Sequence, residues 1–269
     1  MNHATFNQVL ALPASAPDAK LFYGKSEQQF GELWLPSDAP AKGAPLLILI
    51  HGGCWLNAFD IAHSRAMAMS LKLQGYGVWS LEYRRVGDVG GGFPGSFMDV
   101  GEGVDYVRQL HHYPLDLRRV VLIGHSAGGH LALWASSRAQ LPAGHRFHQA
   151  DALPVQGVVG LAAIIDLAVY AQGHSQCQQA AVELMGGTPE QQPLRYQWAS
   201  PVNLPLASNT LLIHGIDDSI VSFAQSQSAV VRLDAEWLPI ANAGHFDLIH
   251  PQADAWVSVL RAIKGVCKP

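Results

Sequence analysis

Charge is scarce in this sequence: only 14% of its 269 residues are Asp, Glu, Lys or Arg, whereas 49% are hydrophobic. So much apolar material is enough for a sizeable core and is not typical of a disordered chain. The formal net charge is -4, and Lys and Arg form no run. Because nucleic-acid binders carry a basic surface, we expect no nucleic-acid partner.

Cysteine is also rare, with only Cys54, Cys177 and Cys267. An odd, sparse set without C-x-x-C spacing does not indicate a disulfide framework. The Cys/His spacings of zinc sites and the H-E-x-x-H motif are absent as well. The sequence therefore predicts no disulfide framework, no metal and no cofactor.

Long hydrophobic runs are missing too. The segment 1–20 has no basic start and only a short, broken apolar stretch, which is unlike a signal peptide. The longest apolar region, 155–171, is interrupted by Gln156 and Asp166, so we interpret it as a buried strand and its exit rather than a membrane span. We expect a soluble cytoplasmic protein without membrane contact, and the sequence leaves monomer or homodimer open.

Short aliphatic runs alternate with segments of helical spacing. Apolar runs of this length are typical of strands buried on both faces of a parallel sheet, and the alternation predicts a doubly wound α/β fold. The segment 31–36 adds an edge strand that Pro36 ends. With neither repeat nor linker, we expect one domain over residues 1–269. The predicted strands are 45–53, 77–84, 118–126, 155–164, 209–217 and 235–242, and the predicted helices are 60–74, 99–111, 126–140, 223–233 and 251–264.

Residues 167–208 separate two predicted strands by more than one crossover helix needs, and they are rich in Gln, Gly and Pro. Ligands of α/β sheets lie beyond the carboxyl ends of the strands. We therefore predict a small cap over 167–208, with a plain surface excursion as the alternative.

The stretch "LIGHSAGGH" (122–130) contains G-x-S-x-G, directly after a predicted strand and at the start of a predicted helix. That strand–turn–helix setting is typical of a nucleophile elbow, in which the flanking glycines permit a tight turn. The sequence therefore predicts Ser126 as a nucleophile, against the alternative of a glycine-rich turn with a capping serine.

A serine hydroxyl needs a base to take its proton and a carboxylate to orient that base. "HGIDDSIV" (214–221) follows one predicted strand, and "ANAGHFD" (241–247) follows the last. These segments supply Asp217 or Asp218, then His245, in the chain order Ser, Asp, His of α/β hydrolases. The residues alone leave the choice between Asp217 and Asp218 open, because only one of two adjacent loop residues can reach His245.

An acyl-transfer site also needs backbone N–H groups that stabilise the developing oxyanion. One is the amide of Ala127, directly after the nucleophile. The glycine-rich loop "HGGCW" (51–55) follows an early strand and is the predicted source of the second.

The chain resembles serine hydrolases of the α/β-hydrolase superfamily. On "HGGCW" it is similar to the His-Gly-Gly branch of carboxylesterases and kynurenine formamidases. The resemblance implies that the amides of Gly53 and Cys54 act with Ala127, and the family spacing His-Gly-x-x-Asp-x-x-Val favours Asp218. Many esterases of this branch have glycine where this chain has Cys54. We therefore expect Cys54 to act through its backbone, so that Cys54→Ala keeps most activity.

The predicted function is hydrolysis of small or short-acyl esters, since the polar cap lacks the extended apolar face of a long-chain lipase. Arylformamidase activity is the close alternative; aminopeptidase-like activity and a non-catalytic ligand-binding role are weaker ones. The substrate is then a small ester or amide. Four side chains are predicted either to line an acyl pocket or to pack as ordinary core: Trp55, Phe93, Met185 and Trp198.

Overall fold

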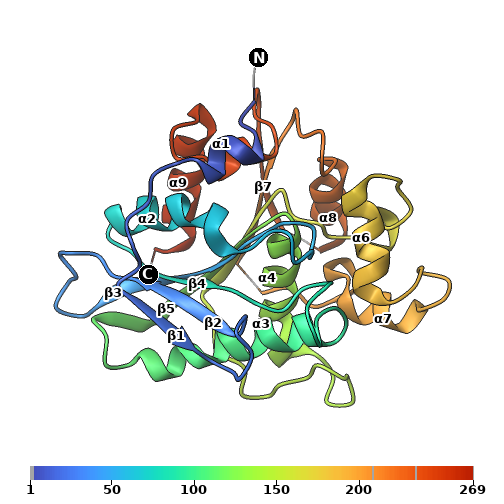
Figure 1. Ribbon diagram of the computed structural model, residues 1–269, viewed down its shortest axis with the longest axis horizontal. Helices are drawn as coiled ribbons and strands as arrows, with labels where there is room; N and C mark the ends of the chain where they lie inside the picture. The colour runs from blue at the N-terminus through green and yellow to red at the C-terminus, as the bar shows by residue number, and fades with distance from the viewer. Residues whose placement is uncertain (1–2, 208, 234, 269) are drawn as a thin grey trace.

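The computed structural model describes residues 3–207, 209–233 and 235–268. Its centre is an eight-stranded sheet in the order β1-β2-β4-β3-β5-β6-β7-β8 (Figure 1). Strands β3 to β8 run parallel, whereas β1 and β2 are antiparallel to their neighbours. The strands are β1 Ala19–Phe22, β2 Phe30–Trp34, β3 Ala44–Ile50, β4 Gly77–Leu81, β5 Leu115–His125, β6 Gly157–Leu161, β7 Thr210–Gly215 and β8 Glu236–Ile240.

Helices cover both faces of the sheet. The α-helices are α1 Phe6–Leu10, α2 Arg65–Leu73, α3 Gly95–Asp105, α4 Ala127–Ser137, α5 Leu167–Tyr170, α6 Gln176–Met185, α7 Pro193–Ala199, α8 Ala224–Leu233 and α9 Asp254–Val266. The 3-10 helices are η1 Ile61–Ser64, η2 Tyr106–Leu110, η3 Arg138–Gln140, η4 Pro201–Asn203 and η5 Phe246–Leu248.

The apolar residues of each central strand divide between two cores because successive side chains point to opposite faces. In β3, Leu46 and Ile48 pack in the core under α3, α4 and α8, while Leu47 and Leu49 pack in the core under α1, α2 and α9. A strand buried on both faces must be apolar at every position. The predicted α/β architecture is confirmed.

Three expectations about the elements are corrected. The segment predicted as an edge strand forms β2, which lies inside the sheet because β1 pairs with it and becomes the edge. The helix predicted over 99–111 begins earlier, at Gly95, and ends in the 3-10 turn η2. The short helix α1 had no counterpart in the sequence interpretation.

The segment predicted as a cap contains α5, α6, α7 and η4. Figure 1 shows α6 and α7 together at one side of the molecule, beside α8. Within the described ranges, no helix is long and apolar enough to cross a membrane.

Candidate active site

Ser126 lies in the sharp turn between β5 and α4, as predicted. Its backbone has φ 56° and ψ −119°, a conformation that is costly for a residue with a side chain. A Cβ on Gly124 would collide with the carbonyl of Gly128, and a Cβ on Gly128 would collide with the carbonyl of Ile50. Both glycines of the motif are therefore required by backbone packing around the turn.

The loop after β7 brings Asp218 to His245, which follows β8. The Nδ1 of His245 donates a hydrogen bond of 2.7 Å to Oδ2 of Asp218. The other carboxylate oxygen accepts the backbone amides of Ile220 and Val221 at 2.8 and 2.9 Å. Since Nδ1 carries the proton, Nε2 remains the basic nitrogen of the ring.

Asp218 is held as a carboxylate although its side chain is fully buried. Burial acts to raise its pKa, but hydrogen bonds from His214 and His245, the charge of His245 and the Val221 amide outweigh that effect. The pKa of Asp218 consequently lies well below its usual range. A partner that is ionised at neutral pH favours the Nδ1–H tautomer of His245 and stabilises the ring when it is protonated.

The neighbouring Asp217 occupies a different environment. Its side chain is 46% exposed, and its Oδ2 lies 3.5 Å from Nε2 of His3. Of the two aspartates that the sequence left open, the structure brings Asp218 to His245.

The "HGGCW" loop leaves β3 with three successive positive φ angles, at Gly53 (103°), Cys54 (54°) and Trp55 (58°). Within the described part of the chain, the amides of Gly53 and Cys54 donate no hydrogen bond. Ala127 is the first residue of α4, where an amide has no partner inside the helix. The three backbone amides predicted to stabilise the oxyanion are thus free to donate to a substrate.

His51 fixes the start of this loop. Its Nδ1 lies 2.8 Å from the carbonyl of Gly52, and its Nε2 lies 3.0 Å from Oε1 of the buried Glu82. The hydroxyl of Tyr83 donates to the His51 carbonyl at 3.0 Å. His51 is therefore a bracing residue.

Cys54 forms a disulfide with Cys177 of α6, which corrects the expectation that the cysteines make no framework. The two residues are 123 positions apart, and their Cα atoms lie 4.9 Å apart, within the normal range for a disulfide. The sequence spacing of the two cysteines did not predict this bond, because they meet only when the predicted cap folds back onto the loop. The Cys54 side chain therefore links the loop to α6.

A cavity of about 270 Å³ opens beside Ser126 and His245. The disulfide forms part of its wall, and the other lining groups are mainly apolar or aromatic. Beyond Ser126, Gly53, His245 and the two cysteines, the lining residues are Phe6, Phe59, His63, His125, Ile220 and Phe246.

The four predicted pocket residues lie elsewhere. Trp55 and Met185 are fully buried, and the indole of Trp55 donates to Nδ1 of His130 at 3.2 Å. Phe93 packs against Phe97, and Trp198 against His145. None of the four lines the Ser126 cavity, and these contacts are those of ordinary packing, which was the alternative interpretation.

The sequence interpretation missed Phe6, Phe59, Ile220 and Phe246. Phe246 directly follows His245 and Ile220 lies two residues after Asp218, so proximity to the predicted triad was an available signal. Phe59 lies four residues after the predicted oxyanion loop, so the same signal applied to it, whereas nothing in the sequence near Phe6 links that residue to the site.

Two histidines beside Ser126 are neutral structural groups. Burial and the neighbouring His245 lower the pKa of His125 well below its usual value, and its Nε2 donates to the His245 carbonyl at 3.1 Å. Burial lowers the pKa of His130 to about 4, and its Nε2 donates to the Ala199 carbonyl at 3.0 Å. Among the residues that the structure describes, no three His, Cys, Asp or Glu side chains are grouped to bind a metal ion.

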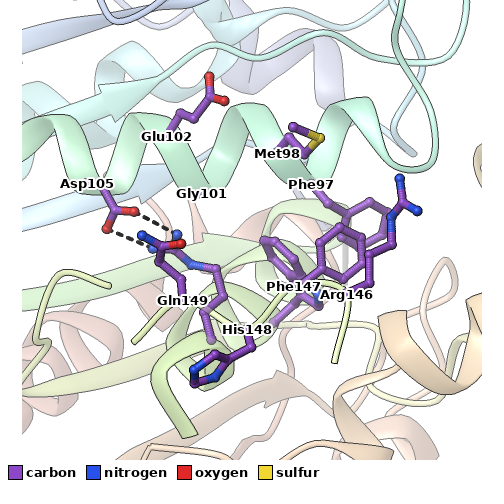
Figure 2. A pocket seen from close by; sticks show the side chains of 11 residues that line it. Phe97, Met98, Gly101, Glu102, Asp105, Arg146, Phe147, His148 and Gln149 are labelled. Carbon is purple, nitrogen blue, oxygen red and sulfur yellow. Dashed lines mark hydrogen bonds and ion pairs between the residues drawn. The ribbon is translucent and has the colours of Figure 1, made fainter. Parts of the chain in front are cut away.

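A second cavity, of about 240 Å³, lies beside α3 (Figure 2). Asp105, at the end of α3, pairs with Arg138 through two hydrogen bonds of 2.8 and 3.0 Å. Phe97 and Phe147 form an aromatic wall, with ring centroids 5.8 Å apart. This cavity contains no residue of the Ser126 group.

Solved structures show which fold this chain has. Esterase B from Lactobacillus rhamnosis superposes with a TM-score of 0.79 at 21% identity, covering 97% of this chain and 90% of that chain. The predicted α/β-hydrolase fold is thereby confirmed. Residues 32–233 match the BD-FAE family, and the chain belongs to that family.

Two curated relatives come from Mycobacterium tuberculosis. Esterase LipC is 29% identical over 252 residues, which are 86% of this chain and 60% of LipC. Esterase LipQ is 27% identical over 231 residues, which are 81% of this chain and 54% of LipQ. The chain thus spans little more than half the length of the curated relatives it matches.

Proposed function

We propose that the protein is a serine esterase that cleaves small or short-acyl carboxylic esters. The observation that carries the proposal is the 2.7 Å bond between His245 and a buried, ionised Asp218, in a site whose cavity is lined by both His245 and Ser126. The α/β-hydrolase fold and the names of the relatives, LipC, LipQ and esterase B, support ester hydrolysis.

In the proposed reaction, Oγ of Ser126 attacks the ester carbonyl carbon while Nε2 of His245 takes the hydroxyl proton. The carbonyl oxygen becomes an oxyanion, which accepts hydrogen bonds from the amides of Gly53, Cys54 and Ala127. The C–O bond then breaks, and His245 protonates the departing alcohol.

A water molecule next attacks the acyl-enzyme, with His245 as the base, and the acid leaves as Ser126 recovers its proton. Asp218 stays ionised and holds His245 throughout.

A fluorophosphonate probe followed by intact-mass measurement tests the proposal. We expect one covalent adduct on the wild-type protein and none on Ser126→Ala. Absence of the adduct on the folded wild type, or its persistence on Ser126→Ala, would refute a serine hydrolase and leave a non-catalytic ligand-binding role.

Arylformamidase activity is the second candidate, and the aromatic lining favours it. The rings of Phe6, Phe59 and Phe246 suit a planar aryl substituent next to the reacting carbonyl. Rates on N-formylkynurenine and 4-nitrophenyl butanoate separate the two. A kcat/KM for the formamide that exceeds the ester value would favour the formamidase.

We also propose that the protein works in an oxidising compartment instead of the expected cytoplasm. Disulfides persist in such compartments and are rare in the cytosol, and the structure contains the Cys54–Cys177 bond. Alkylation of the protein in lysates of its own cells, before and after reduction, tests this. Two extra alkylated thiols after reduction are expected.

A further inference from the structure

The N-terminal segment is attached to the loop that carries His245. The carboxylate of Asp247 accepts from the Ala4 amide at 2.9 Å and lies 2.9 Å from Nδ1 of His3. The same carboxylate accepts the amide of Gly244 at 2.7 Å. One acidic side chain therefore joins the two segments, which stand more than 240 positions apart.

The segment continues into α1, whose position is fixed at both ends. Thr5 and Gln8 form a capping box at its start, and Val9 is buried in the core under α2 and α9. In Figure 1, α1 lies at the top of the molecule. A helix of five residues is not stable alone, so tertiary contacts hold it in place.

Phe6, the first residue of α1, packs into an aromatic cluster at the cavity. Its ring centroid lies 5.2 Å from that of Phe59, 6.0 Å from that of Phe246 and 5.4 Å from that of His63. These rings meet at steep angles, which is a favourable geometry for aromatic pairs.

Phe6 also borders a second hollow of about 250 Å³ on the side of His3 and Asp217. Four residues line both that hollow and the Ser126 cavity: Phe6, Ile220, His245 and Phe246. His245 is the proposed base, Phe246 directly follows it in the chain, and the amide of Ile220 donates a hydrogen bond to Asp218. Of the four residues between the two hollows, Phe6 is thus the one that comes from a separate segment and has no role in the proposed reaction.

We propose that Phe6 is a specificity-determining residue that ends the acyl pocket and excludes long acyl chains. The inference rests on the proposed esterase function and adds the structural reason for short-acyl preference. Removal of the ring joins the two hollows, so that a longer chain can extend past His245 into the space beside His3.

The test compares kcat/KM for 4-nitrophenyl octanoate and 4-nitrophenyl butanoate. In Phe6→Ala, we expect the octanoate-to-butanoate ratio to rise by about tenfold, since even one methylene group in an apolar pocket changes discrimination by that order. In Phe6→Trp, a larger ring should lower the butanoate-to-acetate ratio. The matched control is Phe22→Ala, at a half-exposed ring on β1, for which all ratios should equal those of the wild type.

A second variant tests the attachment of the segment. His3→Ala removes one of its two contacts with Asp247 and should raise the octanoate-to-butanoate ratio in the same direction, by less than Phe6→Ala does. Thermal melting and fluorophosphonate labelling establish that each variant is folded and has a reactive serine.

The outcomes distinguish this inference from the proposed function. A wild-type protein that neither reacts with the fluorophosphonate nor hydrolyses any of the esters would refute the esterase itself. An active wild type whose ratios are unchanged in both folded Phe6 variants would refute only the role of Phe6.

Discussion

The cavity beside Ser126 and the cavity beside α3 have similar volumes, about 270 and 240 Å³, yet the carboxylate associated with each has a different partner. Asp218 binds an imidazole that keeps one basic nitrogen. Asp105 binds the guanidinium of Arg138 through both oxygens and also accepts the Leu153 amide. The pKa of each carboxylate is lowered. A lowered pKa alone therefore does not identify the carboxylate of a catalytic triad. The partner of the carboxylate identifies it, because a histidine can exchange a proton at neutral pH and an arginine cannot.

The two cavities also differ in the long-range link beside them. The Cys54–Cys177 disulfide joins the oxyanion loop to α6 across 123 residues. The Asp105–Arg138 ion pair joins α3 to the segment after α4 across 33 residues. One link is covalent and lies in the wall of the candidate site; the other is ionic and lies away from it.

The largest effect on activity is expected from replacing Asp218, the carboxylate that accepts the hydrogen bond of His245. Asp218→Asn should lower kcat/KM for 4-nitrophenyl butanoate by roughly 10³- to 10⁴-fold, since an amide favours the wrong tautomer of His245. The adjacent Asp217→Asn is the matched control and should stay within about threefold, because an exposed ion pair contributes little. Loss of activity in Asp217→Asn but not in Asp218→Asn would reverse the assignment.

Removal of the disulfide should affect stability more than catalysis. Cys177→Ala should lower the free energy of unfolding by about 3 kcal/mol, because the cross-link restricts the unfolded chain. Cys54→Ala removes the same bond and should have the same cost. Both variants should keep most activity, as the Cys54 amide is unchanged. Urea unfolding without reductant and kcat/KM measure the two effects.

Cys267→Ala is the control for this pair, since Cys267 is buried and free. If Cys177→Ala unfolds at the wild-type urea concentration, the disulfide does not stabilise the fold. If Cys54→Ala is folded but inactive, the side chain contributes to catalysis and the interpretation of the loop is wrong.

Replacing Asp105, at the end of α3, should have the opposite effect to Asp218→Asn, because stability should fall while activity is kept. Asp105→Asn leaves the nearly buried Arg138 guanidinium without its charge partner. We expect a loss of about 2 kcal/mol of stability, less than for a fully buried pair because a quarter of the Asp105 side chain is exposed. Activity should equal that of the wild type. A large fall in kcat/KM at unchanged stability would place this cavity in the catalytic machinery.

The sequence predicted the parts of the molecule whose pattern is local. The central strands were recognisable because burial on both faces demands continuous apolar runs, and Ser126 because G-x-S-x-G stands between a strand and a helix. The edge strand β1 was missed because its residues are only half buried and carry no such pattern. Helix α1 has five residues and depends on its tertiary contacts.

The parts of the candidate site that the sequence did not predict depend on contacts between distant segments. Cys177 reaches Cys54 because the 167–208 segment folds back, and Phe6 reaches the cavity because tertiary contacts, among them those of Asp247, hold the N-terminal segment. Trp55 and Met185 resemble pocket residues by type, but apolar side chains of core and pocket are alike in sequence. Only the fold separates them.

The smallest expected effect is the pH dependence of the ion pair beside α3. Burial acts to raise the pKa of Asp105, but the hydrogen bonds and charge of Arg138 and the Leu153 amide outweigh it and lower the pKa. A carboxyl whose pKa is lowered on folding adds stability at pH values above its pKa in the unfolded chain, which is about 4. That stability is lost as the pH falls through the lower pKa of the folded protein.

The difference in unfolding free energy between the wild type and Asp105→Asn should therefore be constant from about pH 6 to 8 and shrink below about pH 4. Urea titrations of both proteins across this range measure it. An unchanged difference at acidic pH would mean that asparagine loses hydrogen-bond geometry and that the charge itself contributes nothing. The Asp105–Arg138 pair would then stabilise the fold through its hydrogen-bond geometry and not through its charge.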